Sequence, residues 1–155
     1  GHNCSIFNII KFRTMLSEHN FNSEITIHND PRVTTSGKFL RRYKIDEWPT
    51  ILNVIKSDMS FVGPRPEAPK YVALYTEDQK KVLSVKPGIT DPATIAYNNE
   101  ATLLSNKHDS EDVYINNIMP RKLVLNSKYI ETQTLITDAK IILKTILLVI
   151  KSLKK

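Results

Sequence analysis

The clearest hydrophobic pattern lies near the end of the chain, over residues 133–153. Apolar residues recur there at helical spacing, and lysines recur along a second stripe. The apolar stripe comprises Leu135, Ala139, Ile142, Ile146, Val149 and Leu153, and the lysine stripe Lys140, Lys144, Lys151 and Lys155. This pattern predicts a long amphipathic helix. A broad apolar face beside lysines suits a helix in a membrane interface, although such faces more often pack on the domain's own core or on a partner.

A second helical pattern runs from about Asp46 to Lys56. Four apolar residues there fall at offsets 0, 3, 4 and 7, which is one face of a helix: Trp48, Ile51, Leu52 and Ile55. Pro49 is tolerated only in a first turn, so this helix must begin close to Asp46. Just upstream, residues 37–44 carry cations at helical spacing and predict a strongly basic helical segment.

Short strands are predicted over Ile6–Phe12, which is β-branched and apolar, and over Ser60–Val62. Residues 16–30 are polar and predict a loop, and Asp91-Pro92 predicts a turn. Thr76 and Gln79 match a capping box at the start of a helix through Leu83. Further helical stretches are predicted over residues 67–75, 101–104, 110–119 and 121–131. We therefore expect an α-rich α/β fold, with residues 1–155 forming a small single domain with a few short strands and amphipathic membrane-interface helices.

Composition narrows the possible functions. The 155 residues include 22 Lys and Arg against 16 Asp and Glu, and this excess of six positive charges favours anionic partners such as phosphates or acidic lipids. A single cysteine, Cys4, excludes a disulfide within the chain. No run of about 18 apolar residues is present, so we expect no segment that spans a bilayer. The chain also lacks an initiator Met and a signal peptide, and we expect it to be a fragment of a longer protein.

The adjacent acids Asp46 and Glu47 stand at the predicted start of a helix. Acids are common there because they complement the helix dipole, so the pair could have a purely structural role. Neighbouring helical residues point about 100° apart, so one carboxylate could face a substrate while the other holds a metal. A helix start also attracts phosphate.

Candidate phosphate-binding cations are plentiful, namely Lys11, Arg13, Arg32, Arg41, Arg42 and Arg65. Arg65 stands out because Pro64 and Pro66 restrict the backbone around it. A guanidinium fixed in this way can bind phosphate through two parallel hydrogen bonds. Asp138, among apolar residues of the last helix, is either a helix-start acid or a functional one. The four histidines show no metal-ligand spacing, and no Gly-rich phosphate loop, CxxC pair or Ser/His/Asp arrangement is present.

The run DPRVTTSGKFLRRYKIDEWPTILNVIKSDMSFVGPRPE, residues 30–67, closely resembles the signature of the bacterial sugar transferase family, the monotopic phosphoglycosyl transferases. Upstream, GHNCSIFNIIKFRTM resembles the family's strand ending in KFRTM. Downstream, VKPGITDP resembles its PGIT segment, and residues 129–145 resemble its closing YxxxxxxxxDxxIxxxT pattern. The resemblance covers nearly the whole chain.

The resemblance implies an activity and a set of site residues. Asp46 and Glu47 match the catalytic dyad, in which the Asp attacks the sugar-bearing phosphate of a nucleotide diphosphate sugar, usually a UDP-sugar, and the Glu helps hold Mg²⁺. The phosphosugar then passes to polyprenol phosphate, which starts capsule, exopolysaccharide or glycan assembly. Lys11, Arg13, Arg65 and Asp138 match family positions. Phosphate or substrate binding is expected at these four residues and at the candidate cations Arg32 and Arg41. The implied location is the cytoplasmic face of the bacterial inner membrane, with the membrane surface as a partner.

The chain departs from the family pattern in two places. Members begin with a membrane-dipping helical hairpin, whereas this sequence starts where that hairpin and its strand would have ended, which predicts a truncated fragment. Many members carry GLAQVNGR after PGIT, but DPATIAYNN stands here, so Asn98 or Asn99 takes the place of an arginine. A non-catalytic basic module that docks on a membrane or on a partner remains the alternative. We expect no nucleic-acid partner, because neither an aromatic platform nor a recognition helix is evident.

Overall fold

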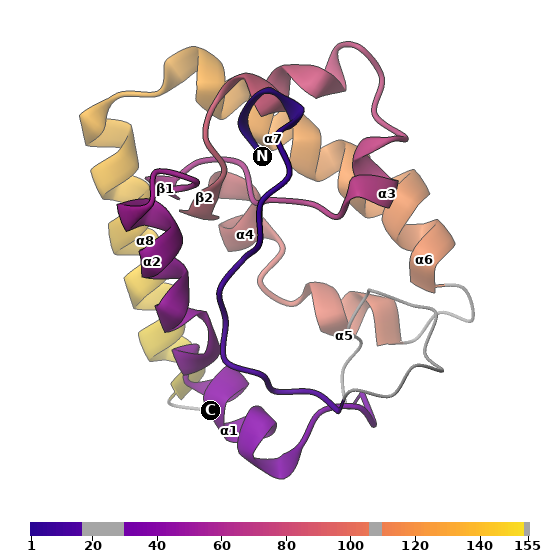
Figure 1. Cartoon of the computed structure of the whole chain (residues 1–155), viewed down its shortest axis with the longest axis vertical. Coiled ribbons are helices and arrows are strands. Elements are labelled where there is room, and N and C mark those ends of the chain that lie inside the picture. The colour runs from indigo at the N-terminus through magenta and orange to yellow at the C-terminus, as the bar shows by residue number, and fades with distance from the viewer. Residues whose placement is uncertain (17–29, 106–109, 154–155) are drawn as a thin grey trace.

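The computed structural model describes residues 1–16, 30–105 and 110–153 (Figure 1). The described elements before Met119 are short 3₁₀, α- and π-helical segments and two short strands, and two longer helices follow them. The elements are η1 His2–Cys4, α1 Thr35–Arg42, η2 Ile45–Thr50, α2 Ile51–Ile55, β1 Ser60–Val62, α3 Pro69–Val72, η3 Gln79–Ser84, β2 Gly88–Thr90, α4 Pro92–Ala96, α5 Glu100–Ser105, α6 Ser110–Val113, the π-helical turn η4 Tyr114–Ile118, α7 Met119–Thr132 and α8 Leu135–Leu153. The predicted α-rich α/β class is confirmed.

Strands β1 and β2 form a small parallel pair, in which Ser60 lies opposite Gly88 and Val62 opposite Thr90. The pair continues beyond β1, because the Gly63 N–H donates to the Thr90 carbonyl at 3.0 Å. Gly63 and Gly88 allow this approach, since a Cβ on Gly88 would overlap the backbone nitrogen of Gly63. The loop after β1 therefore packs on β2 backbone to backbone. The strand over Ser60–Val62 is confirmed, and β2 is an element that the apolar pattern did not predict.

Two clusters of buried side chains hold the helices around this pair. The larger lies among α3, η3, α5, η4 and α7 and comprises Tyr71, Tyr75, Val82, Leu104, Tyr114, Ile118, Met119 and Leu123. The smaller cluster joins β1 to α7 and α8 through Val62, Tyr129 and Ile141. Helix α7 contributes to both clusters, and it runs along the upper right side of the molecule in Figure 1.

The predicted strand over Ile6–Phe12 is wrong. The segment is extended, but its neighbour is a helix, and within residues 1–16, 30–105 and 110–153 it pairs with no strand. The side chain of Asn53, buried in α2, takes the place of a strand: its amide nitrogen donates to the Asn8 carbonyl at 2.8 Å, and its oxygen accepts from the Ile10 N–H at 2.9 Å. The polar loop predicted over residues 16–30 lies almost entirely outside the described residues.

The helix predicted from Asp46 to Lys56 is present as η2 followed by α2, with Pro49 in the 3₁₀ part. Its predicted apolar face is largely exposed rather than buried, and the Trp48 side chain is 68% exposed. The predicted capping box is confirmed, because the backbone N–H groups of Thr76 and Gln79 each donate to the other residue's side-chain oxygen, at 2.9 and 3.3 Å. The helix predicted over residues 67–75 is shorter, since α3 covers only Pro69–Val72.

Helix α8 confirms the long amphipathic helix predicted at the end of the chain. One side contacts β1, β2 and α4. Much of the remaining apolar surface is exposed, at Ile142, Leu143, Ile146, Leu147 and Ile150. Within the described part of the chain, no helix is both long and apolar enough to cross a membrane.

Candidate functional site

The two adjacent acids lie in the first turn of η2, directly after a sharp bend in the chain. Lys44 makes the bend, with a left-handed backbone at φ 57° and ψ 19°. Such a conformation is unfavourable for a residue with a Cβ and persists where the surrounding structure imposes it. The bend turns the chain from α1 into η2 and places Asp46 and Glu47, both half-buried, at the start of a helical segment.

Glu47 is held by two cations that come from distant parts of the sequence. The Arg65 guanidinium donates to its Oε1 through Nη2, and the Lys11 ammonium lies 3.4 Å from the same oxygen. The Glu47 side chain is only 20% exposed. Burial alone would raise the pKa of Glu47, but the charges of Arg65 and Lys11 outweigh burial and bring the pKa down to about 2. Glu47 is therefore ionised at neutral pH.

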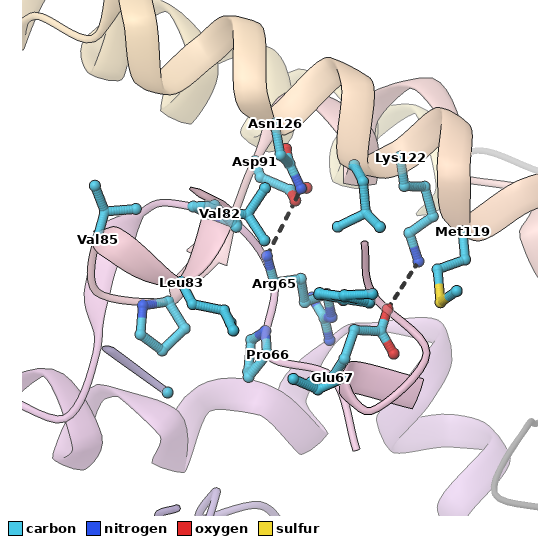
Figure 2. A pocket seen from close by; sticks show the side chains of 16 residues that line it. Arg65, Pro66, Glu67, Val82, Leu83, Val85, Asp91, Met119, Lys122 and Asn126 are labelled. Carbon is cyan, nitrogen blue, oxygen red and sulfur yellow. Dashed lines mark hydrogen bonds and ion pairs between the residues drawn. The ribbon is translucent and has the colours of Figure 1, made fainter. Parts of the chain in front are cut away.

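Arg65 is fixed at three points between its two flanking prolines. Its backbone N–H donates to Asp91 Oδ2 at 3.1 Å, and its Nη1 donates to the Ile89 carbonyl at 3.2 Å. Asp91 is completely buried and caps α4, and its other bonds come from the backbone N–H of Thr94 and the side chain of Asn126. Figure 2 shows the backbone of Arg65 joined to Asp91 below α7. The guanidinium is thus positioned before any ligand binds.

Asp46 lies next to this pair and is half buried. Its Oδ1 is buried and has no hydrogen-bond partner among the described residues. The carbonyl oxygen of Asp46 accepts from the Phe12 N–H at 3.0 Å, so the segment that carries Lys11 runs directly past it. A buried carboxylate oxygen without a donor is unusual and needs an explanation, such as a ligand or a chemical role.

Two cavities of opposite character meet at Arg65. One encloses about 450 Å³ and is mainly apolar, between η2, α2 and β2 on one side and α8 on the other. The second encloses about 440 Å³ and is polar, between the Arg65 loop, α3, α5 and α7. Residues common to both walls are Lys44, Arg65, Thr94 and Asn98. Glu47 lines the apolar cavity, whereas Asp46 lines neither.

The polar cavity contains an ionic cluster that the sequence patterns did not indicate. Lys122 of α7 lies 3.1 Å from Glu100 and 3.7 Å from Glu67, and the Tyr114 hydroxyl donates to Glu67. Burial raises the pKa of Glu67 despite the nearby lysine, and it also raises the pKa of Tyr114. These residues come from three separate parts of the chain, since only Tyr114 and Lys122 are close in sequence. Glu67, which follows Pro-Arg-Pro directly, was the one with a local signal.

The other predicted site residues lie away from these cavities. Arg32 forms a two-pronged ion pair with Asp30, at 2.9 and 2.7 Å, and Arg41 donates to the Thr14 hydroxyl at 2.8 Å. Arg13 is exposed to solvent. Asp138 accepts from the Tyr129 hydroxyl at 2.6 Å, near the corner between α7 and α8. The structure therefore brings together Lys11, Asp46, Glu47 and Arg65, and it does not bring Arg32, Arg41 or Asp138 to them.

The acids of η2 do not form a complete metal cage. No group of three or more His, Cys, Asp or Glu side chains suited to a metal occurs among the described residues. Mg²⁺, however, commonly takes one or two carboxylates and completes its shell with water and substrate phosphates. Glu47 fits that mode, because its carboxylate is ionised and both of its cationic neighbours contact the single oxygen Oε1.

Comparisons with known proteins show the family of the chain. The family model described as bacterial sugar transferase matches residues 1–152. The chain is 35% identical to the galactosyl transferase CpsE of Streptococcus agalactiae over 97% of its own length and 33% of that protein. It is 36% identical to an undecaprenyl-phosphate glucose phosphotransferase of Komagataeibacter xylinus, over 94% of the chain and 27% of that protein. The chain thus spans about a third of the length of these relatives.

Proposed function

The chain belongs to the bacterial sugar transferase family, and from this premise we propose that it is the catalytic domain of a sugar-1-phosphate transferase. The donor is a nucleotide diphosphate sugar, with uridine as the base, and the acceptor is polyprenol phosphate. One observation carries the proposal: Glu47, held by Arg65 and Lys11, lines the apolar cavity close to the wall that it shares with the polar one, and Asp46 is its neighbour in the chain. Such a junction suits an enzyme that moves a phosphosugar from a water-soluble donor to a lipid.

In the first step, a carboxylate oxygen of Asp46 attacks the phosphorus that carries the sugar. The bond between this phosphorus and the oxygen bridging the two phosphates breaks, and the nucleoside monophosphate leaves with that oxygen. The phosphosugar is now joined to Asp46 as an acyl phosphate. Attack requires the half-buried Asp46 carboxylate to turn toward the substrate. Its Oδ1 supports this assignment, because that rotation would break no hydrogen bond from a described residue to Oδ1.

In the second step, a phosphate oxygen of polyprenol phosphate attacks the same phosphorus. The bond to Asp46 breaks, the carboxylate is restored, and the product is a polyprenyl diphosphosugar. The first isoprene units of the acceptor's chain would lie in the apolar cavity, whose walls include Trp48, Ile51 and Leu148. Its phosphate would then lie at the common wall, beside Lys44 and Arg65.

Both steps bring anions together, and the cations of the site reduce that repulsion. Arg65 and Lys44 line both cavities, so each can neutralise phosphate from either substrate. Arg65 is fixed before substrate arrives, which avoids reorganisation during the reaction. Mg²⁺ held by Glu47 and the donor's phosphates would add positive charge that favours departure of the nucleoside monophosphate.

We also propose that this reaction occurs at a membrane surface, on the cytoplasmic face. Exposed apolar residues of α2 and α8, including Ile55 and Leu147, lie on the two elements that form walls of the apolar cavity. An acceptor tail entering that cavity from a bilayer would pass between these apolar surfaces.

The test uses the full-length protein with polyprenol phosphate, Mg²⁺ and a panel of nucleotide sugars labelled in the sugar. We expect release of nucleoside monophosphate and a labelled sugar on the protein when the acceptor is omitted. In Asp46→Asn both signals should disappear. In Glu47→Gln release should slow, while some label still reaches Asp46.

The outcomes separate transferase activity from a docking role. Lipid binding without nucleoside monophosphate release, for every donor, would show a non-catalytic docking module instead. Protein labelling that survives Asp46→Asn would move the nucleophile to another residue.

A further inference from the structure

We infer that the polar cavity holds the donor's sugar and that Glu67 and Glu100 make this site reject sugars that carry a carboxylate. The inference rests on the proposed transferase function, and it specifies the class of donor. A cavity of about 440 Å³ lies within the range of small-molecule sites and can accept a hexose beside its diphosphate. Its walls combine tyrosine hydroxyls, an amide and carboxylates, all of which form hydrogen bonds with sugar hydroxyls.

The position of the acids relative to Arg65 supports this placement. Glu67 follows Arg65 by two residues, and both Glu67 and Glu100 lie close enough to interact electrostatically with its guanidinium. If Arg65 binds the donor's phosphates, a sugar in the polar cavity, joined to phosphorus through its anomeric oxygen, lies near these two carboxylates.

The charge balance of the cluster decides which sugars fit. Among the described residues that line the cavity, Lys122 is the cation that forms ion pairs with the two acids, and it contacts both. The cluster is therefore neutral or negative, whichever protonation state Glu67 adopts. Figure 2 shows Lys122 extending from α7 to Glu67. A sugar carboxylate placed beside Glu67 and Glu100 would meet like charge, whereas a hydroxymethyl group would find acceptors. Lys44 and Arg65 also line the cavity, but they lie on the wall shared with the apolar cavity, where the phosphates are placed.

The burial of these side chains strengthens the effect. Lys122 is 13% exposed, Glu67 18% and Glu100 27%, so water screens the cluster only weakly. Like charges brought together in a poorly solvated site disfavour binding by a large factor. Neutral hexoses and their N-acetylated forms carry no such penalty.

The experiment compares donors that differ only at C6, namely UDP-glucose with UDP-glucuronate and UDP-galactose with UDP-galacturonate. Dissociation constants are measured by calorimetry with the full-length protein. We expect the neutral member of at least one pair to bind about tenfold more tightly or better, given the like-charge penalty. The variants Glu100→Gln and Glu67→Gln should each reduce this ratio severalfold, mainly through tighter binding of the uronate.

Glu77→Gln is the matched control, because Glu77 is an exposed acid outside the cavity. The ratio of its dissociation constants for the uronate and the neutral donor should equal that of the unmodified protein. Equal binding of both members, tighter binding of the uronate, no binding of any donor, or an unchanged ratio in both cavity variants would overturn the inference. Selective binding without nucleoside monophosphate release would instead contradict the proposed reaction and leave the sugar site in place. Melting temperatures of the variants establish that each is folded.

Discussion

Arg65 and Glu47 form an ion pair across 18 residues of sequence, and the pair joins the loop after β1 to the first turn of η2. The same guanidinium donates to the Ile89 carbonyl of β2. The position of Glu47 is therefore tied to the strand pair through one side chain.

Arg65→Lys should lower turnover strongly while the protein stays folded. A lysine keeps the charge but lacks the planar fork that contacts Glu47 and Ile89 together, so it cannot hold the same position beside phosphate. We expect nucleoside monophosphate release to fall about 100-fold, the typical effect of losing one fixed donor to a developing negative charge. Initial rates at saturating donor measure this loss. Arg121→Lys, at an exposed position of α7, is the control and should leave the rate unchanged.

The low pKa of Glu47 should appear in the pH dependence of stability. Its folded pKa is about 2 against an ordinary 4.5, so the folded state binds this proton less readily than the unfolded state. The stabilisation is complete above pH 4.5 and is lost as the pH falls from 4.5 toward 2. At about 1.4 kcal/mol per pKa unit, the shift corresponds to roughly 3 kcal/mol.

Urea unfolding at several pH values measures the stabilisation that comes from the low pKa of Glu47. The loss of unfolding free energy between pH 4.5 and 2.5 should be smaller in Glu47→Gln than in the unmodified protein. Parallel curves for the two proteins would show that Glu47 is not stabilised by its cations. Glu77→Gln is the control, since its side chain is 89% exposed.

Asp91→Asn should destabilise the protein and displace Arg65. The carboxylate is completely buried and accepts from the Arg65 N–H, the Thr94 N–H and the Asn126 amide. An asparagine loses the charge and turns an N–H₂ group toward one of these donors. We expect the unfolding free energy to fall by about 2 kcal/mol or more. Chemical denaturation measures it, and Asp78→Asn, an exposed acid, should cause no change.

Leu148→Gln should affect the second step and spare the first. Leu148 lines the apolar cavity, where a polar side chain would disfavour an isoprenoid tail. The KM for polyprenol phosphate should rise severalfold, while labelling of Asp46 without acceptor keeps its rate. Leu74→Gln, which changes an exposed leucine after α3, is the control. A slower labelling step in Leu148→Gln alone would show that the cavity serves the donor instead.

Local patterns predicted the helices well because their signals lie within a few residues. Thr76 and Gln79 form the capping box that their spacing indicates. The apolar period of residues 133–153 predicts a helix that begins only two residues before the observed start of α8. The rigidity argument for Arg65 also agrees with the structure, since its flanking prolines and Asp91 fix its backbone.

Patterns failed where a distant partner decides the conformation. The apolar segment Ile6–Phe12 looks like a strand, but Asn53 of a helix satisfies its backbone. The available signal was Asn53 itself, a polar residue among the apolar residues of α2. The acidic and cationic cluster around Lys122 joins segments separated by tens of residues, so no spacing in the sequence could reveal it.

The paired glycines of the strand pair also limit how this protein can vary. A single methyl group at Gly63 would press on the Lys86 carbonyl, and one at Gly88 on the backbone of Gly63. Either change would push the Arg65 loop off β2 and carry the guanidinium away from Glu47. In a saturation library selected for glycan production, positions 63 and 88 should therefore retain glycine alone, although neither residue touches a substrate.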